Sequence, residues 1–314
     1  MNLICYDGNK DTVAMKRQNA LTVSLLIAMM AVSLPSLSGL PMSVNILLLI
    51  LYVVVLGAFA FVHGAQTLGL RGIVVFFFIT AITTYFMEWL GTHLGIPFGH
   101  YYYTNRLGPL LMDVPIVIPL QWFNILYATY IMAQVALSGM MRDVSDGKQS
   151  RDGQNLFAAL PRLLVISILT GLFMVSWDFI NDPYMVGVGM WVWINPKEFL
   201  GQMLFGIPLS NFLGWILTSA VVVLMFEIYK RNDHNIRGTQ RNSTGEMRIL
   251  VMVPYLYMCI FQAVSGAISG VFPLSSLEGL GPIALATVSV GLATTLTMIG
   301  YVRLRNQPHL QTSS

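Results

Sequence analysis

The sequence predicts an all-α integral membrane protein, a bundle of about eight transmembrane helices with aromatic outward loops and cytoplasmic N- and C-termini. The 314 residues are 55% hydrophobic and only 10% charged, whereas a soluble domain carries about 25% charge. The apolar residues gather in runs of about 20, the length that crosses the hydrocarbon core of a bilayer. The basic residues fall almost entirely between alternate runs, which indicates a regular series of crossings.

Each apolar run is expected to be an α-helix, because lipid offers no partner for exposed backbone groups. The first run follows Lys16 and Arg17 and also resembles a signal peptide. We expect a retained helix instead, since no clear small-residue cleavage site precedes Pro41. The predicted spans cover roughly 20–37, 43–62, 72–90, 114–138, 162–181, 208–228, 249–271 and 281–302.

Eight crossings place fifteen of the 17 basic residues on one side and leave only Arg106 and Lys197 on the other. By the positive-inside rule the larger group is cytoplasmic, so the loops near 38, 100, 190 and 276 face outward. We expect a multi-pass protein of the cell membrane, with tails at 1–19 and 303–314 and one membrane domain at 20–302. The cytoplasmic group is Lys10, Lys16, Arg17, Arg71, Arg142, Lys148, Arg151, Arg162, Lys230, Arg231, Arg237, Arg241, Arg248, Arg303 and Arg305.

Two outward connections, at 91–113 and 181–206, are rich in Gly, Pro and aromatic residues. Such segments suit a cap on the bilayer surface or re-entrant pieces that line a cavity. An interfacial aromatic belt also explains Trp191 and Trp193. It explains Tyr101 to Tyr103 less well, because the surrounding glycines and prolines indicate a defined turn.

A weak internal repeat joins these connections to the helices around them. Glu88 is followed 31 residues later by Pro119 in Ile-Pro-Leu-Gln-Trp-Phe, and Asp178 is followed 30 residues later by Pro208 in Ile-Pro-Leu-Ser-Asn-Phe. Each unit is a rising helix that ends in an acid, an aromatic cap and a descending helix. A parallel repeat of this kind would set two carboxyl groups side by side at one depth.

Ionisable residues inside membrane spans are costly and are therefore candidates for function. Here the candidates are Glu88, Asp178 and Asp182, none of which has a basic residue inside a span as partner. A carboxyl group that lipid keeps uncharged can donate a proton. Asp178 and Asp182 would share one helical face if the helix continued, but Pro183 predicts a helix end at Asn181–Asp182.

Other chemistries find less support in the sequence. The five histidines are too few for a membrane di-iron oxygenase, and the paired Asp-rich motifs of prenyl transferases are missing. A zinc site from Glu88, His93 and His100 matches no strong ligand spacing, so we expect no metal. No phosphate-binding glycine loop appears, and the net charge of +3 reflects the cytoplasmic loops, so we expect no nucleic-acid partner.

From about Gly69 to Met225 the chain resembles the integral-membrane carotenoid hydratases of the bisanhydrobacterioruberin and gamma-carotene hydratase type. The motifs are unusual and stand in the family's order, whereas the first two and last two spans carry none for comparison. They are Glu88-Trp-Leu-Gly91, Gly95-Ile-Pro-Phe-Gly-His-Tyr-Tyr-Tyr-Thr104, Leu107-Gly-Pro109, Val114-Pro-Ile-Val-Ile-Pro-Leu-Gln-Trp-Phe123, Trp177-Asp178 with Asp182-Pro183, and Gly206-Ile-Pro-Leu-Ser-Asn-Phe-Leu-Gly-Trp215.

The resemblance implies addition of water across a terminal isopropylidene double bond of a C50 or C40 carotenoid, without a cofactor. The residues suit this chemistry, since a dry carboxylic acid can protonate the alkene and aromatic faces can stabilise the cation. We therefore expect Asp178 to be the general acid, with Asp182 or Glu88 orienting water or accepting its proton. The expected substrate-binding residues are Trp122, Trp177, Tyr101, Tyr102, Tyr103, Asn211, Trp191 and Trp215.

Two other functions remain open at this stage. A membrane carrier or binding protein for an isoprenoid lipid would share the apolar spans, although the polar residues here cluster at one end. An isoprenoid cyclase would also begin with alkene protonation, so the residues alone do not separate it from a hydratase. The expected partners are a carotenoid or other isoprenoid substrate and membrane lipid; the sequence does not identify which proteins, if any, are partners.

Overall fold

A computed structural model describes residues 8–145, 156–194, 203–233, 236 and 245–306. These residues form eight long helices, as predicted, and a short helix α8 (Gly245–Ile249) that leads into the seventh. Most helices extend several residues beyond the predicted apolar runs. The long helices are α1 (Gly8–Ser33), α2 (Met42–Thr67), α3 (Leu70–Leu94), α4 (Val117–Ser145), α5 (Leu156–Gly187), α6 (Leu209–Asn232), α9 (Met252–Ser269) and α10 (Leu277–Arg305).

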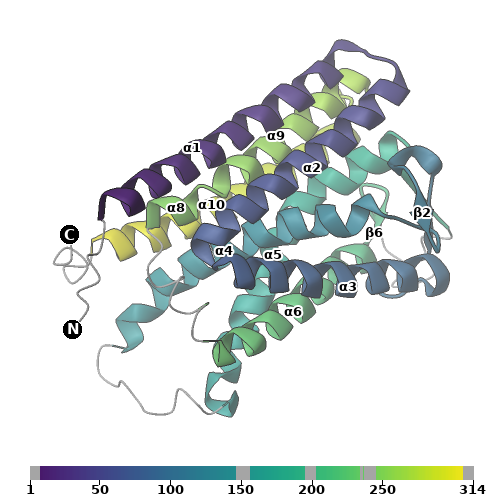
Figure 1. Ribbon diagram of the computed structural model, residues 1–314. Helices are drawn as coiled ribbons and strands as arrows, with labels where there is room; N and C mark the ends of the chain where they lie inside the picture. The colour runs from purple at the N-terminus through teal and green to yellow at the C-terminus, as the bar shows by residue number, and fades with distance from the viewer. Residues whose placement is uncertain (1–7, 146–155, 195–202, 234–235, 237–244, 307–314) are drawn as a thin grey trace, which may run out of the picture.

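The start of α1 and the end of α10 lie at the same end of the bundle (Figure 1), as an even number of crossings requires. Which side of the membrane this end faces stays a prediction. Several basic residues of the predicted cytoplasmic group, among them Lys148, Arg151, Arg237 and Arg241, lie outside the described residues, as does Lys197 on the opposite side.

Helix α4 differs from the other long helices, because the remaining seven are apolar and long enough to cross a membrane by themselves. It contacts α2, α3, α5, α9 and α10, and every residue from Trp122 to Leu137 is buried. Asn124, Thr129 and Gln134 lower its hydropathy but face protein and not lipid. A helix enclosed on all sides does not need the apolar surface that a lipid-facing helix needs.

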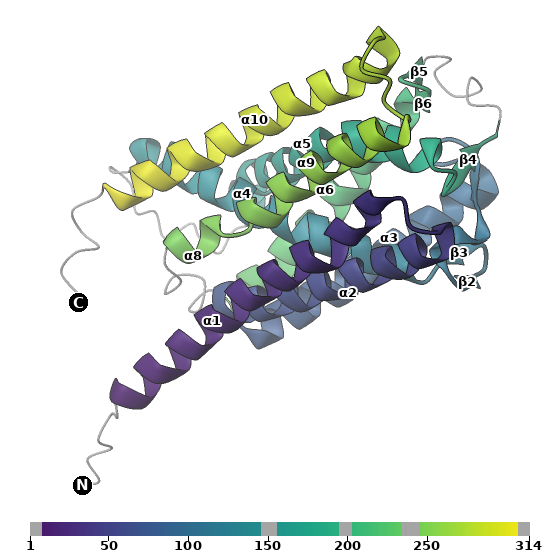
Figure 2. The same ribbon diagram turned by 90° about the horizontal axis from the view of Figure 1, so that it is seen from above.

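Short antiparallel strands gather at the other end of the bundle (Figure 2). Strand β1 (Tyr101–Tyr103) pairs with β4 (Trp191–Trp193), β2 (Leu110–Leu111) with β3 (Val114–Pro115), and β5 (Met203–Leu204) with β6 (Ile207–Pro208). The ladder between β1 and β4 joins the two aromatic connections, which are remote in sequence. We call this end of the molecule the strand end.

The repeat is present in the fold as two units with one order of elements, α3-β1-β2-β3-α4 and α5-β4-β5-β6-α6. In the ladder, Tyr101 pairs with Trp193 and Tyr103 with Trp191, around the central pair Tyr102 and Val192. The equivalent strands of the two units thus pair antiparallel about their midpoints. An approximate two-fold axis between the units produces this arrangement.

The structure corrects the alignment of the two units. The β2–β3 hairpin matches β5–β6, and both turns contain positive φ angles, at Met112 and Asp113 in one and at Phe205 and Gly206 in the other. Pro208 of β6 therefore corresponds to Pro115 of β3. Pro119 lies one helical turn further along, inside α4.

Candidate active site

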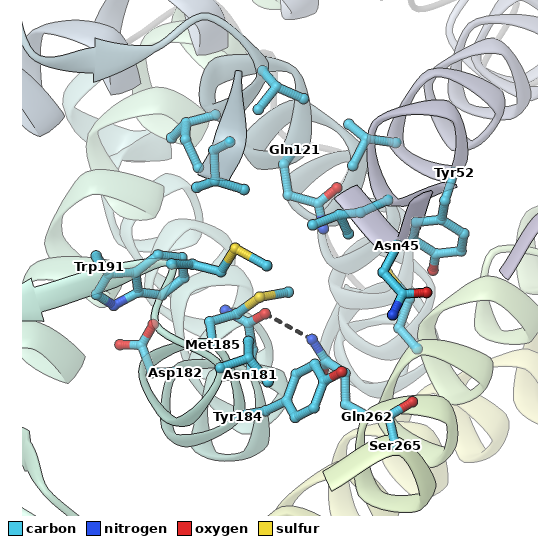
Figure 3. A pocket seen from close by; sticks show the side chains of 18 of the residues that line it. Asn45, Tyr52, Gln121, Asn181, Asp182, Tyr184, Met185, Trp191, Gln262 and Ser265 are labelled. Atoms are coloured by element: carbon cyan, nitrogen blue, oxygen red, sulfur yellow. Dashed lines mark hydrogen bonds between the residues drawn. The ribbon is translucent and has the colours of Figure 1, made fainter. Parts of the chain in front are cut away.

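A cavity of about 380 Å³ lies at the strand end of the bundle, between the two repeat units and helices α2 and α9. Its walls are mostly apolar and aromatic, which is typical of a small-molecule pocket. Glu88 from α3 and Asp182 from α5 both line it, so the two units bring their acids to one space. Figure 3 shows this pocket with Asp182 and Trp191 on one side and Asn45, Gln121 and Gln262 on the other.

Glu88 lies near the end of α3, where its carboxyl group is only 4% exposed. It accepts hydrogen bonds from the Tyr101 hydroxyl, from the Tyr103 hydroxyl at 2.6 Å and from Trp122 Nε1 at 2.6 Å. Three donors converge on one carboxyl group, and the indole N–H can only donate. This arrangement matches the hydrogen-bonding capacity of the ionised carboxylate.

The alternation of strand β1 explains which tyrosines reach Glu88. Tyr101 and Tyr103 point to one face of the strand, and Tyr102 points to the other, where it is 49% exposed. Burial, and then the neighbouring Glu88, raises the pKa of Tyr101 and of Tyr103 well above the usual value for a phenol. Both tyrosines therefore remain protonated donors at physiological pH.

Asp178 and Asp182 lie one turn apart on α5, because the helix continues through Pro183 to Gly187. The helix end predicted at Asn181–Asp182 was wrong. Proline removes one backbone donor, but packing against α6 and α9 holds the helix together. Asp182 reaches the cavity, whereas Asp178 is fully buried behind it.

The two aspartates are held by amide side chains. Asn211 Nδ2 donates to Asp182 and, at 3.3 Å, to Asp178 Oδ2. Asn181 Nδ2 donates at 3.3 Å to Asp178 Oδ1. The acids of the second unit therefore share one amide, and two neighbouring carboxyl groups in an apolar site can hold one proton between them.

Indole rings form the wall between the acids. Trp122 and Trp215, which occupy matching positions seven residues after Pro115 and Pro208, stack with ring centroids 3.9 Å apart. Trp177 packs against Trp215 at 5.9 Å in an edge-on arrangement. These three rings line the cavity, and their faces are suited to stabilising a positive charge.

The cavity brings together most of the predicted substrate-binding residues but not all of them. Tyr102 faces away from it, and the general acid predicted at Asp178 reaches it only through Asp182. The predicted site residues that line the cavity are Glu88, Asp182, Trp122, Trp177, Tyr101, Tyr103, Asn211, Trp191 and Trp215.

Polar residues outside the predicted set also line the cavity. Gln121 comes from α4, Asn45 from α2, Asn181 from α5, and Gln262 with Ser265 from α9. Neutral amides carry no charge, so they do not stand out as ionisable residues do inside a span. A signal was nevertheless present, since Gln262 is an amide in the middle of an otherwise apolar span.

The three ligands considered for zinc have separate partners. His93 stacks on Trp89 with ring centroids 4.8 Å apart, and His100 Nε2 lies 3.0 Å from the Thr92 carbonyl oxygen. Glu88 turns to its tyrosines and Trp122. Among the described residues, no three His, Cys, Asp or Glu side chains gather as a metal site would require.

Comparison with known proteins adds two findings to this geometry. The profile of a family described as carotenoid biosynthesis protein matches residues 44–287. Bisanhydrobacterioruberin hydratase of Haloarcula japonica is 28% identical over 145 residues, which cover 46% of this chain and 41% of that protein. The alignment thus spans less than half of the relative's length. No solved structure matches the chain significantly.

Proposed function

The chain belongs to the carotenoid biosynthesis protein family, and we propose that it adds water across a terminal isopropylidene double bond of a C50 or C40 carotenoid to give a tertiary alcohol. The observation that carries this proposal is that Glu88 and Asp182 face one cavity with indole walls. The name of the relative, a hydratase, supports the same reaction class.

The reaction begins with proton transfer from the Asp178–Asp182 pair. Asp182 touches the cavity, so it is the member that protonates the CH carbon of the double bond. The two electrons of the π bond form the new C–H bond and leave a tertiary cation on the dimethyl carbon. Asn211 donates to both acids and holds the pair in place. A positioned acid of this kind contributes roughly 10²–10⁴-fold to a rate.

The cation is stabilised by the charge and the rings around it. Glu88, hydrogen-bonded by Tyr101, Tyr103 and Trp122, supplies a fixed negative charge that needs no reorganisation during the reaction. The faces of Trp177 and Trp215 add cation–π attraction, worth about 2 kcal/mol for a desolvated ring.

Water then completes the reaction. Its oxygen forms a bond to the cation, and the resulting oxonium loses a proton to the aspartate pair. The pair regains the proton that it gave to the alkene, so the protein returns to its starting state and the balance is one carotenoid plus one water. No oxidant, reductant or leaving group takes part, so the atoms and electrons balance.

The direct test is expression of the chain in cells that accumulate lycopene-derived carotenoids, followed by mass analysis of the pigments. We expect a product heavier than its precursor by one water, and none in cells that carry the empty vector. An isomer of unchanged mass would identify a cyclase, and unchanged pigments with carotenoid bound to the purified protein would identify a carrier. Either result would overturn the proposal.

A further inference from the structure

The cavity has two chemically different walls. One wall carries the acids and indoles of the repeat units, while the other carries neutral polar side chains from α2, from α9 and from Gln121 of α4. Four oxygens of this second wall make no hydrogen bond of normal geometry within the protein, although the Tyr184 hydroxyl lies close enough to interact with Ser265. They are Asn45 Oδ1, Gln121 Oε1, Gln262 Oε1 and Ser265 Oγ. A buried acceptor without a partner costs about 1–3 kcal/mol, so four at one cavity indicate a ligand that donates hydrogen bonds.

The orientation of the Gln262 amide follows from the acids. Asn181 uses its Nδ2 to donate to Asp178, so its Oδ1 is left to accept. Gln262 Nε2 donates to that oxygen at 2.7 Å. This bond fixes the orientation of the Gln262 amide and leaves its oxygen without a donor. The hydrogen-bond network therefore assigns which end of the amide is oxygen.

Ser265 follows Gln262 by three residues on α9, which places both on one face of the helix. Each is only 6% exposed. Figure 3 shows the two residues together below Asn45, with the Gln262 amide turned toward Asn181. Two acceptors on one helical face, linked to the aspartate pair, form a compact polar site inside an apolar cavity.

We propose that Gln262 and Ser265 bind the water molecule that attacks the carotenoid cation. A water that donates its two hydrogens to Gln262 Oε1 and Ser265 Oγ presents its lone pairs to the cavity, as a nucleophile must. A buried water needs 2–4 polar partners, and the wall supplies that number. This inference rests on the hydration proposed above and assigns the residues that supply its second substrate.

The chemistry provides a readout that separates water capture from protonation. In D2O the aspartate pair carries deuterium, so protonation gives a cation with one new C–D bond. When water does not capture this cation, the same carbon loses H⁺ to the conjugate carboxylate, and the carotenoid is recovered with deuterium at its vinylic position. Exchange into recovered substrate therefore measures protonation, and alcohol measures capture.

The test compares Gln262→Met with the wild type in D2O-equilibrated membranes that contain the carotenoid. Methionine keeps the length of the side chain and removes its hydrogen bonds. Gln66→Met is the matched control, because Gln66 lies at the far end of α2, where it donates to Thr22 at 3.2 Å. We expect Gln262→Met to make at least about tenfold less alcohol while exchange continues, and Gln66→Met to behave as wild type.

Each outcome decides the proposal. Alcohol at the wild-type rate, or a parallel fall of alcohol and exchange, would overturn it. Should Gln262→Met fail to accumulate, Ser265→Ala decides in the same assay, with a smaller loss of alcohol and retained exchange expected. A wild-type protein that produces neither alcohol nor exchange would reject the hydratase function itself, which is a different result.

Discussion

Glu88 and the Asp178–Asp182 pair occupy equivalent ends of α3 and α5, yet their surroundings differ. The first unit surrounds one acid with three donors, whereas the second places two acids on one helix and gives them one shared amide, Asn211. Donors favour the ionised carboxylate, and a second acid favours retention of a proton. In the proposed mechanism, the duplicated framework thus presents a fixed charge from one half and a mobile proton from the other.

The largest effect is expected on the proton-donating side. Asp182→Asn removes the only acid of the pair at the cavity wall, so we expect hydration to fall about 1000-fold, measured as alcohol formed by membranes with equal amounts of protein. Asp113→Asn is the control, since Asp113 lies 74% exposed in a surface pair with His93. Retention of more than about a tenth of the activity would contradict the assigned role.

A smaller loss is expected on the charge-bearing side. Glu88→Gln keeps the shape of the side chain but removes the counter-charge to the cation, and we expect an about 100-fold loss of alcohol formation. Glu278→Gln, an exposed position at the start of α10, is the control. Glu88 is expected to act after protonation begins, so Glu88→Gln should lose less deuterium exchange than Asp182→Asn. Equal losses of exchange in the two variants would contradict the different roles assigned to the two sides.

The tyrosine donors to Glu88 are expected to contribute less than the acid itself. Tyr101→Phe and Tyr103→Phe each remove one hydrogen bond to the carboxylate, and we expect each to lower the hydration rate about tenfold. Tyr102→Phe, in the same strand but on its exposed face, is expected to match the wild type. An effect at Tyr102 equal to that at its neighbours would indicate a general role of the strand and would remove the support for a network around Glu88.

The smallest effect concerns stability at high pH. Burial, and then Glu88, raises the pKa of Tyr101 and Tyr103 in the folded protein, while an unfolded phenol titrates near pH 10. Above about pH 10 the folded state therefore holds more protons, and stability falls as pH rises. We expect the unfolding temperature of the Tyr101→Phe/Tyr103→Phe variant to fall less between pH 9 and 11 than that of the wild type. An identical fall would refute the link.

Much of the framework could be predicted because it depends on local sequence. The apolar runs specify the helices, and the few acids inside them are costly enough to stand out. The path of α5 beyond Pro183 could not be predicted in this way, since neighbouring helices support it. Helix α4 was predicted as the span at 114–138, but its enclosure on all sides could not be, because it depends on the helices packed around it.

The candidate site was less accessible to sequence reasoning. The ladder of β1 and β4 depends on two connections about ninety residues apart, and nothing within either one specifies its partner. The orientation of Tyr102 follows from that ladder, so it was wrongly grouped with its neighbours at the cavity. Gln262 and Ser265 belong to a span without a recognised motif, and the role proposed for them depends on the position of α9 beside α5.

The ladder between β1 and β4 has a consequence for product formation. It ties a cap over the acid end of a cavity that is smaller than a whole carotenoid. On the proposed function, one end of the rigid polyene would therefore lie under the cap while the other stayed among helices and lipid. A pigment with two reactive ends must withdraw, turn round and dock again. We therefore expect distributive kinetics, in which the mono-alcohol is released and accumulates before any diol appears.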